Sequence, residues 1–272
     1  MNISDSIYYV GVSDKNLDLF EGQYPVPNGM SYNSYVIKDE KIAVLDTVDK
    51  RFKDEWLKNI KEVLGSDAPD YLVVHHMEPD HSSNIKNFLD TYPNCKVVSS
   101  FAAFNMMKNY FGTAFTDRQV IIEEGSKLEL GKHKLNFVAA PMVHWPEVHV
   151  SFEESEGILF SADGFGKFGV MGTKDNWDDE ARRYYIGIVG MHGMFVQNLL
   201  KKASALPIKK ICPLHGEILE DNLAHYIDLY DKWSGFKKEK DGVCIAYTTV
   251  YGHMKEAVEK LSDEFKSAGV NV

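Results

Sequence analysis

The chain has 272 residues, of which 44% are hydrophobic and 26% are charged, and its formal net charge at pH 7 is −10. These values are typical of a soluble globular protein with one large or two ordinary domains. The acidic excess is spread along the chain, which argues against binding to nucleic acid or to an anionic membrane. No apolar run approaches the roughly 18 residues of a membrane span, and the N-terminus lacks a leader-like pattern, so the sequence predicts a cytoplasmic protein.

A β-hairpin and a helix are predicted first in the chain. Apolar runs at 34–37 and 42–45 flank a charged turn from Lys38 to Lys41, which is the pattern of a hairpin. Apolar residues then recur at helical intervals from Phe52 to Ile60, with Asp49 as a candidate N-cap.

Strands and helices alternate after this, and several strands come in pairs. Strands are predicted at 71–74, 96–99, 119–122, 134–139, 148–152, 158–161 and 210–212, and helices at 85–90, 101–111 and 219–233. The long amphipathic segment 178–205 predicts one long helix or a helix pair. The mixture favours a layered α/β domain with mixed sheets over a purely parallel, doubly wound one.

The segment 234–242 has the composition of a linker, because it is charged and flanked by glycines. A strand is predicted directly after it at 243–247, and a helix at 255–267. We therefore expect a domain at 1–235, a linker at 236–242 and the first part of a second domain at 243–272.

The three cysteines, Cys95, Cys212 and Cys244, are far apart and flanked by apolar, strand-like residues. They are predicted to be buried thiols that form neither a disulfide framework nor a zinc knuckle. The candidate functional residues of the chain are therefore its acids and its ten histidines.

The loop from His75 to Asn84, between a predicted strand and a predicted helix, concentrates ligand-type side chains. Four of them fall within six residues: His76, Glu78, Asp80 and His81. Pro79 favours an extended conformation at Glu78, and an extended loop can direct alternate side chains to one place. The alternative is a polar capping loop, but capping requires acids and hydroxyls and not a pair of histidines.

Three further candidate ligands each follow an apolar strand and lie near a glycine or proline. They are His144 after 134–139, Asp163 after 158–160 and His215 after 210–212. Ligands gather in the loops beyond strand ends in α/β sheets. A single histidine is usually structural, but the same arrangement at four strand ends indicates a common site.

The resulting inventory has seven members, too many for one tetrahedral zinc ion: His76, Glu78, Asp80, His81, His144, Asp163 and His215. It suits two metal ions bridged by a carboxylate. Three carboxylates and two divalent ions leave one positive charge, which favours a bridging hydroxide or a reduced oxygen species. Imidazole with carboxylate ligands suits iron or manganese at least as well as zinc.

The ligand order His-x-Glu-x-Asp-His, then His, Asp and His, resembles the di-metal core of the metallo-β-lactamase superfamily. Most hydrolases of that group carry His-x-His-x-Asp-His, whereas Glu78 in the middle position resembles the flavodiiron proteins, or A-type flavoproteins, which reduce dioxygen or nitric oxide. Further matches to that family are Gly29-Met-Ser-Tyr-Asn-Ser-Tyr35, Val44-Leu-Asp-Thr47, His144-Trp-Pro146, Ala181-Arg-Arg-Tyr-Tyr185 and Pro213-Leu-His-Gly216.

The resemblance implies a metallo-β-lactamase-like αββα sandwich of mixed sheets that holds a non-haem pair of iron ions. One iron would take His76, Glu78 and His144, and the other would take Asp80, His81 and His215. Asp163 would bridge the two irons.

The family also carries an FMN-binding flavodoxin-like domain after this core, and residues 243–272 resemble its first βα unit. The residues that resemble its phosphate loop are Thr248, Thr249, Val250, Tyr251, Gly252 and His253. Hydroxyls and a helix N-terminus can cradle a phosphate there. Because about 100 to 150 residues are normal for such a domain, we expect that this chain does not retain FMN.

Two other residues have candidate roles beside the metal ions. Asp46, at a strand end, resembles an acid that orients a ligand imidazole through its free N–H, with a turn acid as the alternative. Tyr185, or its neighbour Tyr184, could offer a hydroxyl as a proton donor, with helix packing as the alternative. His75 and His149 are expected to be structural or solvent-facing, and the remaining histidines are assigned no metal role.

The resemblance implies a di-iron oxidoreductase in electron transport, which reduces dioxygen to water or nitric oxide to nitrous oxide. Its electrons would come through FMN from a donor such as rubredoxin or a flavin reductase, in a head-to-tail homodimer. The alternatives are an iron-pair protein that stores or senses oxygen without turnover, and a di-zinc hydrolase that uses a bridging hydroxide.

Overall fold

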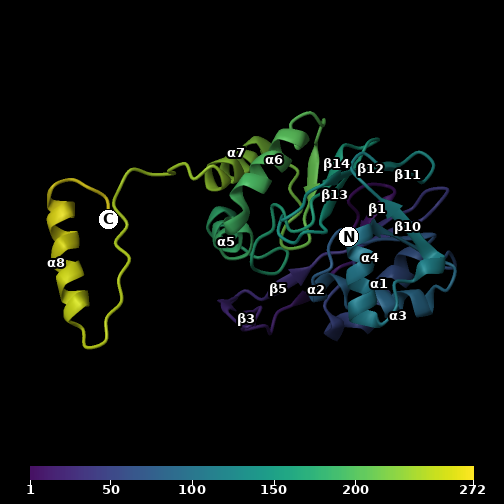
Figure 1. The fold of residues 1–272 in the computed structure, drawn as a ribbon, viewed down its shortest axis with the longest axis horizontal. Coiled ribbons are helices and arrows are strands. Elements are labelled where there is room, and N and C mark those ends of the chain that lie inside the picture. The colour runs from purple at the N-terminus through teal and green to yellow at the C-terminus, as the bar shows by residue number, and fades with distance from the viewer. The chain divides into compact units, whose positions relative to one another are not determined.

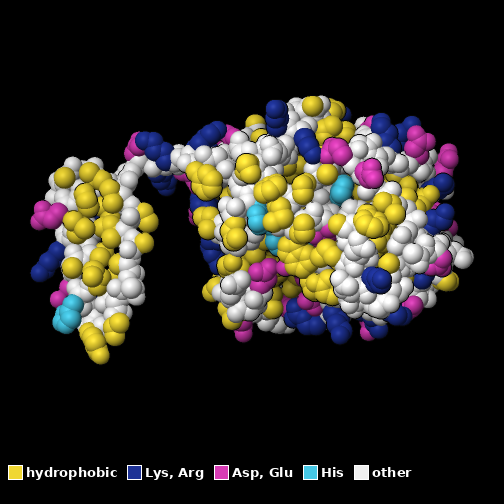
Figure 2. All heavy atoms as spheres, viewed as in Figure 1, with side chains coloured by type: hydrophobic (Ala, Val, Ile, Leu, Met, Phe, Trp, Pro, Cys, Tyr) yellow, Lys and Arg dark blue, Asp and Glu magenta, His cyan; other side chains and the backbone are white.

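The computed structural model describes all 272 residues and divides them into two compact units, unit 1 at Met1–Gly235 and unit 2 at Phe236–Val272. Every helix falls short of the roughly 20 apolar residues that a membrane-spanning helix requires. On the face of unit 1 drawn in Figure 2, acidic and basic side chains are interspersed and not gathered by sign.

Two mixed β-sheets form the centre of unit 1 (Figure 1). The first has the strand order β1 (Ile7–Tyr9), β6 (Tyr35–Ile37), β7 (Ala43–Leu45), β8 (Tyr71–Val73), β9 (Lys96–Ser100), β10 (Gln119–Ile122). The second has the order β11 (Lys127–Glu129), β12 (Lys134–Ala139), β13 (His149–Glu153), β14 (Ile158–Phe160), β15 (Lys210–Cys212). Two short strand pairs join β2 (Val12–Asp14) to β5 (Met30–Tyr32) and β3 (Leu19–Phe20) to β4 (Tyr24–Pro25).

Alternation along each strand divides the apolar side chains between two cores. On β7, Leu45 packs into the core between the sheets, and Val44 packs into the core beneath the helices. On β14, Phe160 and Leu159 divide in the same way. These strands are buried on both faces, so they appear in the sequence as continuous apolar runs.

Helices cover both outer faces and complete four layers. They are α1 (Lys53–Leu64), α2 (Pro79–Ser82), α3 (Ile85–Thr91) and α4 (Phe101–Phe111), then α5 (Trp177–Tyr184), α6 (Gly193–Ala203) and α7 (Leu223–Ser234). Figure 1 shows α1, α3 and α4 on one side of the sheets and α6 and α7 on the other. Trp56, Ile60 and Leu64 recur every fourth residue and bury one face of α1. The predicted layered α/β fold is therefore confirmed.

The predicted elements of unit 1 are present, with two refinements. The segment 178–205 is a helix pair, because a π-helical turn at Tyr185–Val189 and a 3₁₀ turn at Gly190–His192 separate α5 from α6. The helix expected from residue 219 begins later, at Leu223, because Leu219 bridges back to Ile211 beside β15.

In unit 2 the prediction of a strand at 243–247 is wrong, whereas the helix is present as α8 (His253–Ser267). No strand pairs with residues 243–247, and a strand requires a hydrogen-bonded neighbour. For the same reason Cys244 is exposed and not buried as predicted, while Cys95 and Cys212 are buried. Identification of residues 243–272 as a flavodoxin-like unit stays a prediction.

Candidate metal centre

The seven side chains predicted as metal ligands meet at one end of the two sheets, beyond the carboxyl ends of four strands. Two follow β8, two lie on α2, and the others follow β12, β14 and β15: His76, Glu78, Asp80, His81, His144, Asp163 and His215. Glu78 is extended, as predicted, but Asp80 and His81 lie on a one-turn helix and not on an extended loop. Pro79 accounts for this, because its fixed φ suits the first position of a helix.

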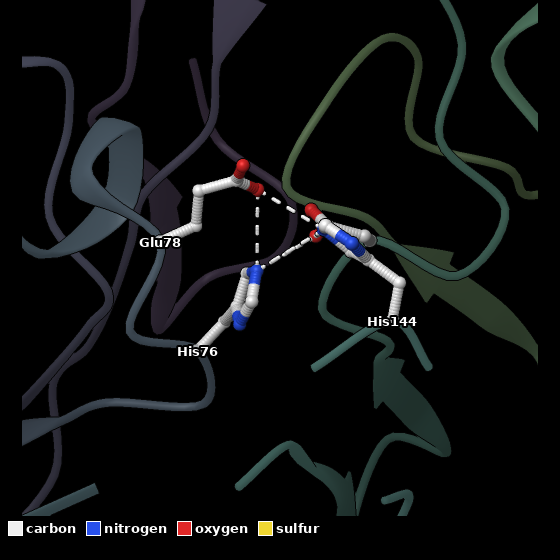
Figure 3. Close-up of side chains that lie close together, drawn as sticks. His76, Glu78 and His144 are labelled. Atoms are coloured by element: carbon white, nitrogen blue, oxygen red, sulfur yellow. Dashed lines mark hydrogen bonds and ion pairs between the residues drawn. The ribbon is translucent and has the colours of Figure 1, made fainter. Parts of the chain in front are cut away.

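The first group of donors has the spacing of a single-ion site. His76 Nε2 lies 3.3 Å from Glu78 Oε2 and 3.1 Å from Asp163 Oδ2, and His144 Nε2 lies 3.0 Å from each of these oxygens. Figure 3 shows the Glu78 carboxylate and the two imidazoles turned toward one another. A cation about 2.1 Å from its ligands separates neighbouring ligands by about 3.0 Å in octahedral and about 3.4 Å in tetrahedral geometry.

The second group lies beside the first and shares one carboxylate with it. The Nε2 atoms of His81 and His215 are 3.0 Å apart, and Asp80 Oδ2 lies 3.4 Å and 3.3 Å from them. Asp163 directs Oδ2 at the first group, and its Oδ1 lies 3.7 Å from His215 Nε2. Its two oxygens thus face both groups, as a bridging ligand requires.

The protonation pattern of the second group suits a cation better than a hydrogen-bond network. The Nδ1 atoms of His81 and His215 face the carbonyl oxygens of Thr47 and Ser31 at 3.3 Å and 2.7 Å, so each ring donates its N–H outward. Their Nε2 lone pairs then converge. The buried carboxylate oxygens of Asp80 and Asp163 accept no well-directed hydrogen bond. The residues therefore fit a pair of divalent cations.

Burial and mutual charge perturb the pKa values at this centre. Burial lowers the pKa of His144, but Asp163 and Glu78 outweigh it and raise the pKa to about 9. Burial raises the pKa of the Asp163 carboxyl, yet His76 and His144 hold it well below its usual range. Burial lowers the pKa of His81, so its ring is neutral at pH 7, as a metal ligand must be.

Asp46 does not orient a predicted ligand imidazole, which corrects the sequence analysis. Its Oδ2 lies 2.6 Å from Nδ1 of His75, whose Nε2 lies 2.7 Å from Ser151 Oγ. The acid behind a ligand is Glu147, whose Oε1 lies 3.0 Å from His76 Nδ1. Sequence reasoning missed it because no spacing rule links an acid after His144 to an imidazole that lies 71 residues earlier.

Tyr185, predicted as the catalytic hydroxyl, packs among other aromatic rings, and its role in catalysis stays a prediction. Its ring packs against Tyr230 and Trp233, with centroids 5.2 Å and 5.5 Å away. Its neighbour Tyr184 packs against His215, with ring centroids 5.5 Å apart. Burial and the nearby Asp163, Glu78 and Asp80 carboxylates raise the pKa of Tyr184 well above its usual value, so the phenol keeps its proton.

A hollow of about 240 Å³ borders the donor groups. Glu78 and Asp80 line it together with the apolar side chains of Leu17, Leu19 and Phe20. Its size admits a diatomic molecule or a few waters.

The residues predicted to bind the FMN phosphate lie in unit 2, ahead of α8. Thr248, Thr249, Val250, Tyr251 and His253 line a shallow hollow of about 230 Å³. Gly252 has φ +92°, and its N–H donates to Thr249 Oγ1 at 3.0 Å. Because this N-cap residue is a glycine, the N-terminal turn of α8 has no side-chain cap. The site role of these residues stays a prediction.

The fold and the paired donor groups define a metallo-β-lactamase-like protein with a candidate two-metal centre. Residues 30–216 match the family model described as ODP family beta lactamase. The chain is 30% identical to a nitric oxide reductase of Moorella thermoacetica over 99% of this chain and 70% of that protein. The chain therefore belongs to the ODP family, the flavodiiron proteins.

Two solved structures have the same fold. The flavodiiron protein of Giardia intestinalis is 29% identical, with a TM-score of 0.91 over 99% of this chain and 67% of that one. The rubredoxin oxygen:oxidoreductase of Desulfovibrio gigas is 27% identical, with a TM-score of 0.92 over 100% of this chain and 70% of that one. The chain spans about half the length of the cyanobacterial diflavin flavoproteins that it also matches.

Proposed function

We propose that this chain supplies the di-iron oxidoreductase core of a flavodiiron-type enzyme that reduces dioxygen to water, nitric oxide to nitrous oxide, or both. One observation carries the proposal: seven buried or partly buried donors form two adjacent groups that share Asp163. Two of the matched proteins are named for these substrates, one as a nitric oxide reductase and one as a rubredoxin oxygen:oxidoreductase.

A bound iron pair supplies two stored electrons and open coordination positions for a diatomic substrate. Leu17, Leu19 and Phe20 line one part of the hollow beside Glu78, and they would offer a small diatomic substrate an apolar approach to the donors. The Tyr184 hydroxyl keeps its proton near three carboxylates and is a candidate for a proton donor.

The electron count separates the two substrates. Reduction of two nitric oxide molecules to nitrous oxide and water takes two electrons and two protons, which a ferrous pair can match. Reduction of dioxygen to two waters takes four electrons and four protons, so half of the electrons must come from elsewhere. We propose FMN of the complete family architecture as that route, with the Thr248–His253 loop as one part of its phosphate site, in a cytoplasmic homodimer served by rubredoxin or a flavin reductase.

The test is a single turnover of the chain loaded anaerobically with two equivalents of ferrous iron and no electron donor. With nitric oxide we expect one nitrous oxide per two irons, measured by gas chromatography. With dioxygen we expect oxidised iron and released peroxide. His81→Ala should retain one iron and form no nitrous oxide, whereas His225→Ala, at a half-exposed histidine paired with Asp178, should behave as the parent.

Three results would contradict the proposal. Complete four-electron reduction of dioxygen without a donor would contradict the electron count, because the iron pair stores only two electrons. Reversible oxygen uptake without oxidation of the iron would indicate a sensor or store. Hydrolysis of an ester or amide by zinc-loaded, iron-free chain would indicate a hydrolase.

A further inference from the structure

Two buried carboxylates stand behind adjacent histidines, and each contacts one ring Nδ1 and one backbone N–H. Asp46 accepts the backbone N–H of His75 at 2.7 Å and faces its Nδ1 at 2.6 Å. Glu147 faces Nδ1 of His76 at 3.0 Å and accepts the next backbone N–H, that of Met77, at 2.8 Å. His76 points its other nitrogen at the first donor group, whereas His75 points its other nitrogen at Ser151.

The acceptor behind His76 differs in charge from those behind the second donor group. His81 and His215 donate to the neutral carbonyls of Thr47 and Ser31. A carboxylate behind a ligand imidazole fixes its tautomer and raises its basicity more than a neutral carbonyl does. The two metal positions therefore differ although each has two imidazoles.

Glu147 also changes the charge balance of the centre. Its side chain and that of His76 are both fully buried, and its second oxygen has no hydrogen-bond partner. With Glu78, Asp80 and Asp163 it makes four carboxylates, which balance the four positive charges of two divalent ions. The charge of Glu147 affects the His76 position most, because only one imidazole ring would separate this carboxylate from a cation bound there.

We propose that Glu147 is a positioning residue that holds His76 as the Nδ1–H tautomer and makes the His76–Glu78–His144 position the tighter of the two metal positions. This inference rests on the proposed function only in requiring that both donor groups bind a cation.

The test is anaerobic titration with Co²⁺ alone, followed by its visible absorption. His81→Ala leaves only the His76 position, and His144→Ala leaves only the His81 position. Glu147→Gln, which keeps an acceptor oxygen but removes the charge, should weaken Co²⁺ binding about 10- to 100-fold in the His81→Ala background. In the His144→Ala background it should leave the affinity unchanged. Asp46→Asn is the matched control, because it removes a buried carboxylate from the adjacent, non-ligand histidine.

Thermal melting of every variant separates folding from positioning. A selective loss with Glu147→Gln, and not with Asp46→Asn, supports the inference. Equal losses at both positions, or no loss at the His76 position, would overturn it and leave the proposed function standing. If the parent chain binds fewer than two cobalt ions, the proposed function itself fails. If Glu147→Gln melts at the parent temperature, loss of the fold is excluded as the cause.

Discussion

Glu153→Gln tests a buried ion pair at the end of unit 1 remote from the metal centre. His133 Nδ1 lies 2.9 Å from Glu153 Oε1, and both side chains are buried. His133 Nε2 lies 2.8 Å from Ser6 Oγ and 3.9 Å from Glu156, while Asp39 accepts the backbone N–H of His133. His133 directly precedes β12 and Glu153 is the last residue of β13, so the pair joins the ends of these strands that lie away from His144.

The magnitude follows from the pKa of Glu153. Burial opposes its ionisation, but hydrogen bonds from His133, Ser155 and the backbone lower its pKa from 4.5 to about 2. A shift of this size corresponds to about 3 kcal/mol of unfolding free energy. Because the folded pKa is depressed, this stability is complete above about pH 4.5 and is lost as the pH falls toward 2.

His133 sets the upper limit of the pH window. Its hydrogen bond to Glu153 raises the pKa of the imidazole above 6.5. A raised folded pKa contributes stability that is complete below about pH 6.5 and is lost as the pH rises through the folded value. The pair therefore stabilises unit 1 most between about pH 4.5 and 6.5.

Thermal melting at several pH values measures the effect. At pH 5.5 Glu153→Gln should lower the melting temperature by roughly 6 to 12 °C. The difference in melting temperature between the variant and the parent should become smaller toward pH 2 and at high pH. Glu129→Gln, at an exposed partner of Lys134, should cost about 1 kcal/mol or less. Equal melting temperatures for the two variants would refute the reasoning. So would a difference between Glu153→Gln and the parent that does not change with pH.

Three further outcomes are expected. Tyr184→Phe should slow nitrous oxide formation in a single turnover by roughly 10²-fold, whereas Tyr185→Phe should not, as timed by rapid-quench gas analysis. Gly29→Ala should lower the urea midpoint far more than Gly22→Ala, because its Cβ would lie 2.2 Å from a backbone oxygen while Gly22 faces open space, and both have positive φ. Ferrous iron at 100 times its dissociation constant should add about 2.7 kcal/mol per position to the unfolding free energy, and His215→Ala should remove one such increment in calorimetry.

Local sequence signals predict the strand ends of unit 1 well. The apolar runs before His76, Asp163 and His215 are almost wholly buried, and the run before His144 alternates buried and half-buried residues. Each run and the polar residue after it can therefore be recognised without the fold. Parallel or mixed strands then carry their ends to one edge of the sheets. This is why a pattern at four separate places in the chain predicts one cluster of side chains.

Partners that depend on long-range packing cannot be predicted in this way. Asp46 and Glu147 both follow apolar residues, yet only the packed sheets decide that Asp46 reaches His75 and Glu147 reaches His76. Tyr184 and Tyr185 are adjacent, and the α-helix changes to a π-helical turn between them. The direction in which each ring points therefore cannot be predicted from helical spacing. The strand expected at 243–247 needs a neighbour that no described residue provides.

The central claim is that seven side chains from four strand ends enclose two cations. Anomalous diffraction at the iron edge, from crystals of the chain purified from iron-replete cells, tests it most directly. We predict two iron peaks about 3.5 to 4 Å apart, with Asp163 within bonding distance of both. A single peak, a pair that scatters only at the zinc edge, or metal bound away from these residues would contradict the account.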